Sequence, residues 1–210
     1  MKTQPVPDPA VRRISLYLRQ LESLHNGGET KVSSKQLAES LQLSAAQVRK
    51  DLGYFGQFGR PGLGYSVAEL ISHLRQVLGT DRTWNVVVVG AGDLGRALLR
   101  YRGFQKKGFE VVAAFDLQAS KVGRNVGQVP VHHMDRLEEI VRAHSVRLAV
   151  LAVPPEAAQD VAARLCGAGV KGLLNFAPCV LQVPPGVAVG PVDIAAHLEQ
   201  LSFQVHTTGM

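Results

Sequence analysis

The chain has 210 residues and a formal net charge of +6. This length exceeds that of one average domain, and with 46% hydrophobic residues the chain can bury two small cores. No apolar run approaches the roughly 18–20 residues that span a bilayer, and residues 1–9 lack the apolar core of a secretory signal, so we expect a cytoplasmic protein without a membrane partner. Two cysteines, Cys166 and Cys179, are too few for a disulfide framework or a metal site, and we expect both to be reduced thiols.

The N-terminal part is basic and begins with an amphipathic helix. Residues 1–83 carry eleven Lys or Arg against seven Asp or Glu, so most of the excess positive charge lies there, as expected for a part that meets a polyanion. Apolar residues at helical spacing predict a helix over 10–25, which Asn26 and the two following glycines end.

Two short helices are predicted next, each opened by a serine that is followed three residues later by a glutamine. These capping boxes are Ser33 with Gln36 and Ser44 with Gln47, and the helices would cover 34–41 and 45–54. The turn between them has the length found in helix-turn-helix motifs, which makes the second helix the candidate recognition helix.

The candidate recognition helix carries polar side chains on or near its exposed side. They are Ser44, Gln47, Arg49, Lys50 and Tyr54. Arg and Gln can read base edges, whereas Lys and Tyr suit phosphates, so these residues are the candidate DNA contacts. A solvated helix face is the alternative explanation.

Residues 55–65 alternate aromatic residues with glycines and predict a short hairpin, or wing. Arg60 at its tip is placed to enter a minor groove, and a flexible glycine loop is the alternative. Ser66 with Glu69 forms a third capping box, which opens a fourth helix that Gly79 ends. Together these elements predict a winged-helix domain over residues 1–80.

A glycine-rich turn follows an apolar run at the start of the second half. Residues 86–89 are four consecutive valines, typical of a strand buried on both faces of a parallel sheet. The turn is Gly90-Ala91-Gly92-Asp93-Leu94-Gly95, and a plausible helix follows it. This Gly-x-Gly-x-x-Gly pattern between a strand and a helix favours dinucleotide binding, with its backbone amides against a pyrophosphate.

Asp116 ends the next apolar run, 21 residues beyond Gly95. That spacing suits a carboxylate on the adenosine ribose diol, and a strand-end turn former is the alternative. No arginine follows until Arg124, so a 2′-phosphate should be repelled, which favours NAD(H) over NADP(H).

Strands and helices continue to alternate along the rest of the chain. Strands are expected at 148–153, at 172–176 and at 187–189, and helices at 135–143 and 156–166. The alternation predicts a Rossmann-type parallel sheet over 81–190. Residues 193–201 form a terminal amphipathic helix with Asp193 as its N-cap, so 191–210 is a candidate dimer element. The seven histidines show no metal-ligand spacing, and we expect no metal.

In this order, the motifs resemble the bacterial redox-sensing transcriptional repressor Rex family over nearly the whole length. The matching segments are 48–56, 62–65, 90–95, 101–104, 121–123 and 175–178. The resemblance implies a homodimer with a C-terminal helix swapped onto the partner subunit. It also implies binding to a palindromic double-stranded operator when the NADH/NAD+ ratio is low, and release by NADH, with NAD+ competing.

The resemblance also assigns roles to individual residues. Arg49 and Lys50 correspond to the recognition-helix contacts, and Arg19 to an arginine that couples the two domains. The cofactor-binding set comprises Gly90, Ala91, Gly92, Asp93, Leu94, Gly95, Asp116, Lys121 and Val153, with Tyr101, Asn175, Phe176, Pro178 and Asp193 around the nicotinamide. Two positions depart from the family pattern: Pro61 replaces a wing arginine, and Ile194 replaces an aromatic residue after Asp193.

The sequence therefore predicts an NADH-responsive repressor and not an enzyme. One alternative is a DNA-binding regulator whose glycine loop holds coenzyme A or another adenine nucleotide. The other is an NAD-dependent dehydrogenase, although this would leave the first eighty or so residues unexplained and no proton-relay residue is evident.

Overall fold

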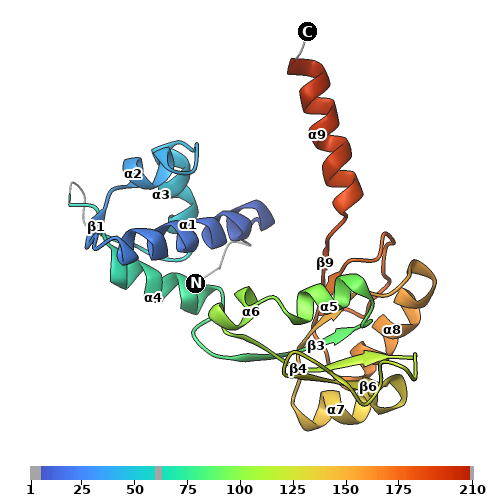
Figure 1. Ribbon diagram of the computed structural model, residues 1–210. Helices are drawn as coiled ribbons and strands as arrows, with labels where there is room; N and C mark the ends of the chain where they lie inside the picture. The colour runs from blue at the N-terminus through green and yellow to red at the C-terminus, as the bar shows by residue number, and fades with distance from the viewer. Residues whose placement is uncertain (1–5, 60–62, 209–210) are drawn as a thin grey trace. The chain divides into compact units, whose positions relative to one another are not determined.

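In the computed structural model the chain forms two compact units, Met1–Arg82 and Thr83–Met210. The structure describes residues 6–59 and 63–208. Each unit has its own hydrophobic core, and the elements are labelled in Figure 1. Within the described ranges, none of the helices is both long and apolar enough to cross a membrane.

The first unit is a helical domain with a small sheet. Its elements are α1 (Asp8–Asn26), β1 (Lys31–Val32), α2 (Ser34–Glu39), α3 (Ala45–Gly53), β2 (Tyr65–Ser66) and α4 (Val67–Val77). Apolar faces of all four helices meet in one core, whose fully buried members include Ile14, Leu37, Leu52 and Leu74. The predicted helices are thus confirmed with small shifts of their ends.

Two of the three predicted capping boxes form only in part. At Ser66 the hydroxyl accepts from the Glu69 amide at 3.4 Å, and among the described contacts this is the one bond of that box. At Ser33 both bonds of the capping box form, but at Ser44 the hydroxyl accepts from the Gln47 amide while the Gln47 side chain turns to Asp51. The hairpin predicted within 55–65 includes residues outside the described ranges and stays a prediction. The described pairing joins β2 to the distant β1, with Val32 opposite Tyr65. Short strands leave little local pattern, so a non-local partner decided the pairing.

The second unit is built on a seven-stranded sheet of order β5-β6-β4-β3-β7-β8-β9. Its strands are β3 (Trp84–Val89), β4 (Phe109–Asp116), β5 (Asn125–Val126), β6 (Val129–His133), β7 (Leu148–Leu151), β8 (Gly172–Asn175) and β9 (Ala188–Pro191). All neighbours pair in parallel except β5 with β6. The sequence missed β5 and β6, which are too short and too polar to show a clear period.

Helices cover both faces of this sheet. They are α5 (Asp93–Leu99), α6 (Gly103–Lys106), α7 (Leu137–Ala143) and α8 (Pro155–Ala168), with a short 3-10 turn at Met134–Arg136 before α7. Val87 and Val89 pack with α7 and α8, while Val86 and Val88 pack on the opposite face with α5. Figure 1 shows α5 and α7 on opposite sides of the sheet. The arrangement is the predicted Rossmann type, and β3 ends where the strand order reverses.

The terminal helix α9 (Ile194–Thr208) has no buried residue. Its exposed apolar residues include Ile194, Leu198, Leu201 and Val205, and their spacing of four, three and four residues places them along one stripe. The helix is longer than the predicted 193–201 segment. Asp193 is confirmed as its N-cap, because Asp193 Oδ1 accepts from the Ala196 amide at 3.0 Å.

Candidate nucleic-acid interface and dinucleotide site

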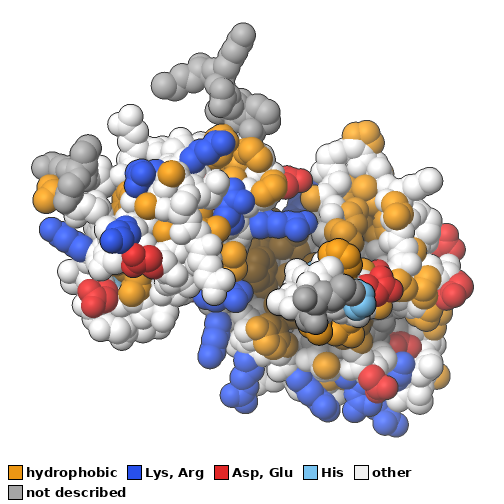
Figure 2. All heavy atoms as spheres, turned by 90° about the horizontal axis from the view of Figure 1, so that it is seen from above, with side chains coloured by type: hydrophobic (Ala, Val, Ile, Leu, Met, Phe, Trp, Pro, Cys, Tyr) orange, Lys and Arg blue, Asp and Glu red, His pale blue; other side chains and the backbone are white. Residues whose placement is uncertain are grey.

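The exposed side of α3 carries the candidate DNA-reading cations. Arg49 and Lys50 are both exposed. Arg49 Nη1 donates to Ser34 Oγ of α2 at 3.1 Å, so this side chain is steadied at the protein surface. Ser44 caps the helix through its hydroxyl, and Tyr54 is half-buried at the other end. In the view of Figure 2, Lys and Arg side chains (blue) appear at many points of the surface.

The opposite side of α3 holds a buried carboxylate that the sequence analysis missed. Asp51 has no exposed surface and lies among apolar core residues. Burial opposes its ionisation, but hydrogen bonds from Arg13, Tyr17 and Gln47 outweigh burial and hold the pKa of Asp51 below its ordinary value. A signal existed in the sequence: Asp51 shares a helix face with Val48 and Leu52, where a charge requires a partner.

The wing region is described only in part. A Cβ on Gly59 would overlap with the backbone oxygen of Gly64, so the two arms of the loop approach each other closely. Phe58 packs edge-on against His73 of α4, with ring centroids 5.4 Å apart. Arg60 and Pro61, the predicted tip, lie outside the described residues.

The glycine turn between β3 and α5 has three distinct glycine environments. Gly90 has φ +96°, and a Cβ there would overlap with the Ala152 carbonyl oxygen. A Cβ on Gly95 would overlap with the Gly90 carbonyl oxygen, because α5 packs directly on the turn. At Gly92 a Cβ would meet no heavy atom within 4 Å. Gly90 and Gly95 are therefore required by the fold, whereas Gly92 leaves space that a phosphate can approach.

Asp116 stands beside this turn at the end of β4. Its Oδ2 accepts from the Ala91 amide at 2.8 Å and from Lys121 Nζ at 3.0 Å, and its Oδ1 accepts from the Gln118 amide at 2.9 Å. Burial opposes ionisation, but these three bonds outweigh it and lower the pKa of Asp116. The residues fit the adenosine end of a dinucleotide, since an ionised carboxylate lies next to an open glycine turn.

The candidate nicotinamide residues lie in two loops of the same unit. Tyr101 is 61% exposed, its ring stacks edge-on with Phe104 at 5.2 Å, and it lies against Gly103, where a Cβ would overlap with it. Asn175 is buried, and its amide nitrogen donates to the backbone oxygens of Ala177 and Cys179. Asn175 thus shapes its loop.

Several other predicted residues are placed without a test of their role. Phe176 and Val153 are half-buried, whereas Pro178 and Leu94 are exposed. Asp93 is exposed in the first turn of α5, and Arg19 is exposed on α1. Among the described residues, no group of three or more His, Cys, Asp or Glu could hold a metal ion.

Comparison with family models gives one match in each unit. The model described as "Putative DNA-binding protein N-terminus" matches residues 5–53, and the model described as "CoA binding domain" matches residues 81–179. The division agrees with a nucleic-acid-binding first unit and a nucleotide-binding second unit.

Relatives and solved structures match almost the whole chain. The redox-sensing transcriptional repressor Rex of Carboxydothermus hydrogenoformans is 49% identical over 205 residues, 98% of this chain and 99% of that protein. Rex of Desulfitobacterium hafniense is 44% identical over 207 residues and covers 99% of both chains. The crystal structure of RSP with β-NAD+ and operator DNA has a TM-score of 0.93 and 34% identity, covering 98% of this chain and 95% of that chain. RSP with β-NADH has a TM-score of 0.88 and 32% identity, covering 98% and 97%.

Proposed function

The chain belongs to the Rex family of redox-sensing transcriptional repressors, and we propose that it binds a palindromic operator when the NADH/NAD+ ratio is low and leaves it when NADH binds. One observation carries the proposal: a single chain joins a helix-turn-helix with an exposed cationic second helix to a glycine turn that is open at Gly92. Binding to chromosomal DNA would place the protein in the cytoplasm. Rex proteins are repressors and not enzymes, so the dehydrogenase alternative is set aside.

The second unit would hold the dinucleotide by its own residues. NADH supplies a nicotinamide whose charge differs from that of NAD+, and this difference is the signal. The backbone from Gly90 to Gly95 would receive the pyrophosphate, and Asp116 with Lys121 would meet the adenosine ribose. Tyr101 offers an exposed ring for the nicotinamide. Val153, Phe176 and Pro178 would lie around the nicotinamide as well.

The first unit would hold the operator through α3 and the wing. Arg49 is suited to a guanine edge, because a guanidinium can donate two parallel hydrogen bonds. Lys50, Tyr54 and Ser44 would contact phosphates, and Arg60 would enter the minor groove. Release fits a population shift, in which NADH favours a dimer state whose recognition helices no longer match successive half-sites.

A homodimer follows from the exposed apolar surfaces of the second unit. The α9 stripe of Ile194, Leu198, Leu201 and Val205 has nothing packed on it within the described chain. The sheet face opposite α8 holds an apolar hollow of about 310 Å³, lined by Val86, Phe104, Leu148, Leu174 and other residues. We propose that α9 is swapped onto the partner subunit, where Asp193 and Arg19 would link the nicotinamide end to the first unit.

A fluorescence titration tests the function. The protein is bound to a labelled palindromic duplex selected from random sequence, and NADH, NAD+, NADPH and coenzyme A are added separately at fixed salt. Release by NADH at a far lower concentration than by the others is expected. Release by coenzyme A alone would support the second candidate, which the CoA-binding family match favours. No specific duplex would refute operator binding.

Alanine variants test the DNA face. Lys50→Ala is expected to lower the slope of log affinity against log salt by about 1, as for loss of one phosphate contact. Arg142→Ala, which removes an exposed cation from α7 of the second unit, is the matched control and should leave that slope unchanged. Equal slopes for Lys50→Ala and the wild type would remove Lys50 from the interface.

A further inference from the structure

We propose that Asp51 locks the recognition helix α3 to α1, so that the two helices move as one body and a displacement of α1 reaches Arg49 and Lys50. The inference deepens the proposed function and rests on it for the part that concerns NADH. The lock itself is a property of the first unit and can be tested without any ligand.

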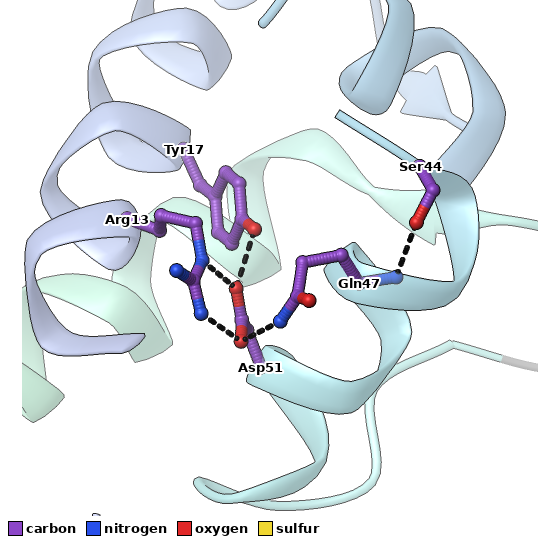
Figure 3. A network of polar contacts seen from close by, with 5 residues as sticks. All are labelled: Arg13, Tyr17, Ser44, Gln47 and Asp51. Carbon is purple, nitrogen blue, oxygen red and sulfur yellow. Dashed lines mark hydrogen bonds and ion pairs between the residues drawn. The ribbon is translucent and has the colours of Figure 1, made fainter. Parts of the chain in front are cut away.

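In the lock, three side chains donate hydrogen bonds to the carboxylate of Asp51 (Figure 3). Asp51 Oδ2 accepts from Arg13 Nε at 2.5 Å and from Tyr17 Oη at 2.6 Å. Asp51 Oδ1 accepts from Arg13 Nη2 at 2.8 Å and from Gln47 Nε2 at 2.8 Å. Each oxygen thus accepts two bonds, so the acceptor capacity of the carboxylate is filled within the protein.

The geometry fixes both the position and the rotation of α3. Arg13 and Tyr17 are four residues apart on α1, so they donate hydrogen bonds to Asp51 from two successive turns on one face of the helix. The Arg13 bond is bidentate and charge-assisted, which makes it directional. The surrounding core, which includes Ile14 of α1 and Val48 of α3, is apolar and tolerates sliding, because hydrophobic attraction has no direction.

The network also fixes the part of α3 that carries the candidate DNA contacts. Arg49 and Lys50 immediately precede Asp51, so they stand on the same turn of α3 as the fixed carboxylate. The Gln47 amide nitrogen donates one of its two N–H groups to Asp51 at 2.8 Å, which holds this side chain against the buried carboxylate. We therefore assign Gln47 a positioning role in place of the base-reading role expected from the sequence.

Stability alone is a poor explanation for this cluster. Removing a carboxylate and a guanidinium from water costs free energy that their attraction only partly returns, and a well-packed apolar replacement is often as stable. A directional buried network is suited to fixing one arrangement of two helices. Loss of the network should therefore change the amide protection of α3 and the effect of NADH on operator affinity more than it changes the melting temperature.

The first arm of the test measures hydrogen exchange in the full-length protein without DNA or cofactor. Asp51→Asn introduces amide hydrogens where the network needs acceptors, and Tyr17→Phe removes one bond while keeping the ring. Both variants should lose amide protection in α3, by about tenfold for the single bond to a charged group, while β3 and β7 stay unchanged. Glu39→Gln, at an exposed carboxylate on α2, is the control. Unchanged α3 protection in Tyr17→Phe and Asp51→Asn would overturn the lock.

The second arm measures the ratio of operator dissociation constants with and without saturating NADH. This ratio should fall toward one in both variants, while NADH affinity measured without DNA stays at the wild-type value. A ratio unchanged from the wild type in folded variants would overturn the transmitting role of Asp51. If the wild-type protein itself ignores NADH while the exchange result holds, the proposed function fails and the lock between α1 and α3 stands.

Discussion

Gly92→Ala separates cofactor binding from folding. Gly92 has φ −71° and ψ −168°, which an alanine also adopts, and its added Cβ would meet no heavy atom within 4 Å. Alanine is a poorer N-cap than glycine, but it also reduces the freedom of the unfolded chain by about 0.4–1 kcal/mol. The free energy of unfolding should therefore change by less than about 1 kcal/mol, because these two effects oppose each other.

The same methyl group would occupy the space proposed for the pyrophosphate. Loss of one hydrogen bond to a charged group costs about 1.5–3 kcal/mol. NADH affinity should therefore fall by roughly 10- to 150-fold. The assay is NADH fluorescence titration, with urea unfolding of the same samples.

Alanine substitutions at two other glycines serve as controls for this prediction. Gly167→Ala within α8 also meets no neighbour and should leave NADH affinity unchanged. Gly95→Ala would force α5 away from the Gly90 carbonyl and should destabilise the second unit by more than about 2 kcal/mol. Wild-type NADH affinity in Gly92→Ala would refute the proposed pyrophosphate position.

Three other changes give separable outcomes. Leu201→Glu places a charge on the α9 stripe and should convert a dimer into a monomer in light scattering, whereas a persisting dimer would remove α9 from the interface. The pKa of Asp51 is lowered in the folded protein, so its stabilising contribution is complete above the ordinary carboxyl pKa of about 4 and is lost as the pH falls below that value. Between about pH 5 and 3 the wild type should therefore lose more stability to urea than Asp51→Asn, and equal losses would contradict this linkage. Gly103→Ala should displace the exposed Tyr101 ring and change the ratio of NADH to NAD+ affinity with little effect on melting; an unchanged ratio would argue against Tyr101 as the nicotinamide contact.

Sequence patterns that span a few neighbouring residues correctly predicted several helices and the central strand. The apolar period fixed α1, and the serine caps located the starts of α2, α3 and α4 within a residue or so of where they lie. The unbroken valine run identified β3 at the centre of the sheet, because a strand buried on both faces needs apolar residues throughout. These features depend on neighbours within a few positions along the chain.

Features that depend on distant partners were not predictable in the same way. The pairing of β1 with β2 joins segments more than thirty residues apart through two residues each. The second capping bond of Ser44 was lost because Asp51 competes for Gln47 from the same helix while it is itself held by α1. Choosing among such partners requires the packing of whole helices, which a spacing rule does not contain.

Asp116 lies beside the glycine turn, and its surroundings there include a cation that the spacing argument did not consider. Its spacing from Gly95 predicts a ribose contact, and the lack of an arginine before Arg124 favours NAD(H) over NADP(H). The Lys121 Nζ lies 3.0 Å from the Asp116 Oδ2, so a lysine supplies positive charge at this position although no arginine is near in the sequence. We expect selection against a 2′-phosphate to depend on Asp116 remaining ionised, which its three hydrogen bonds favour by lowering its pKa. Because Oδ1 accepts a single bond, from Gln118, it has capacity for one ribose hydroxyl without disturbing the bond that Ala91 donates to Oδ2.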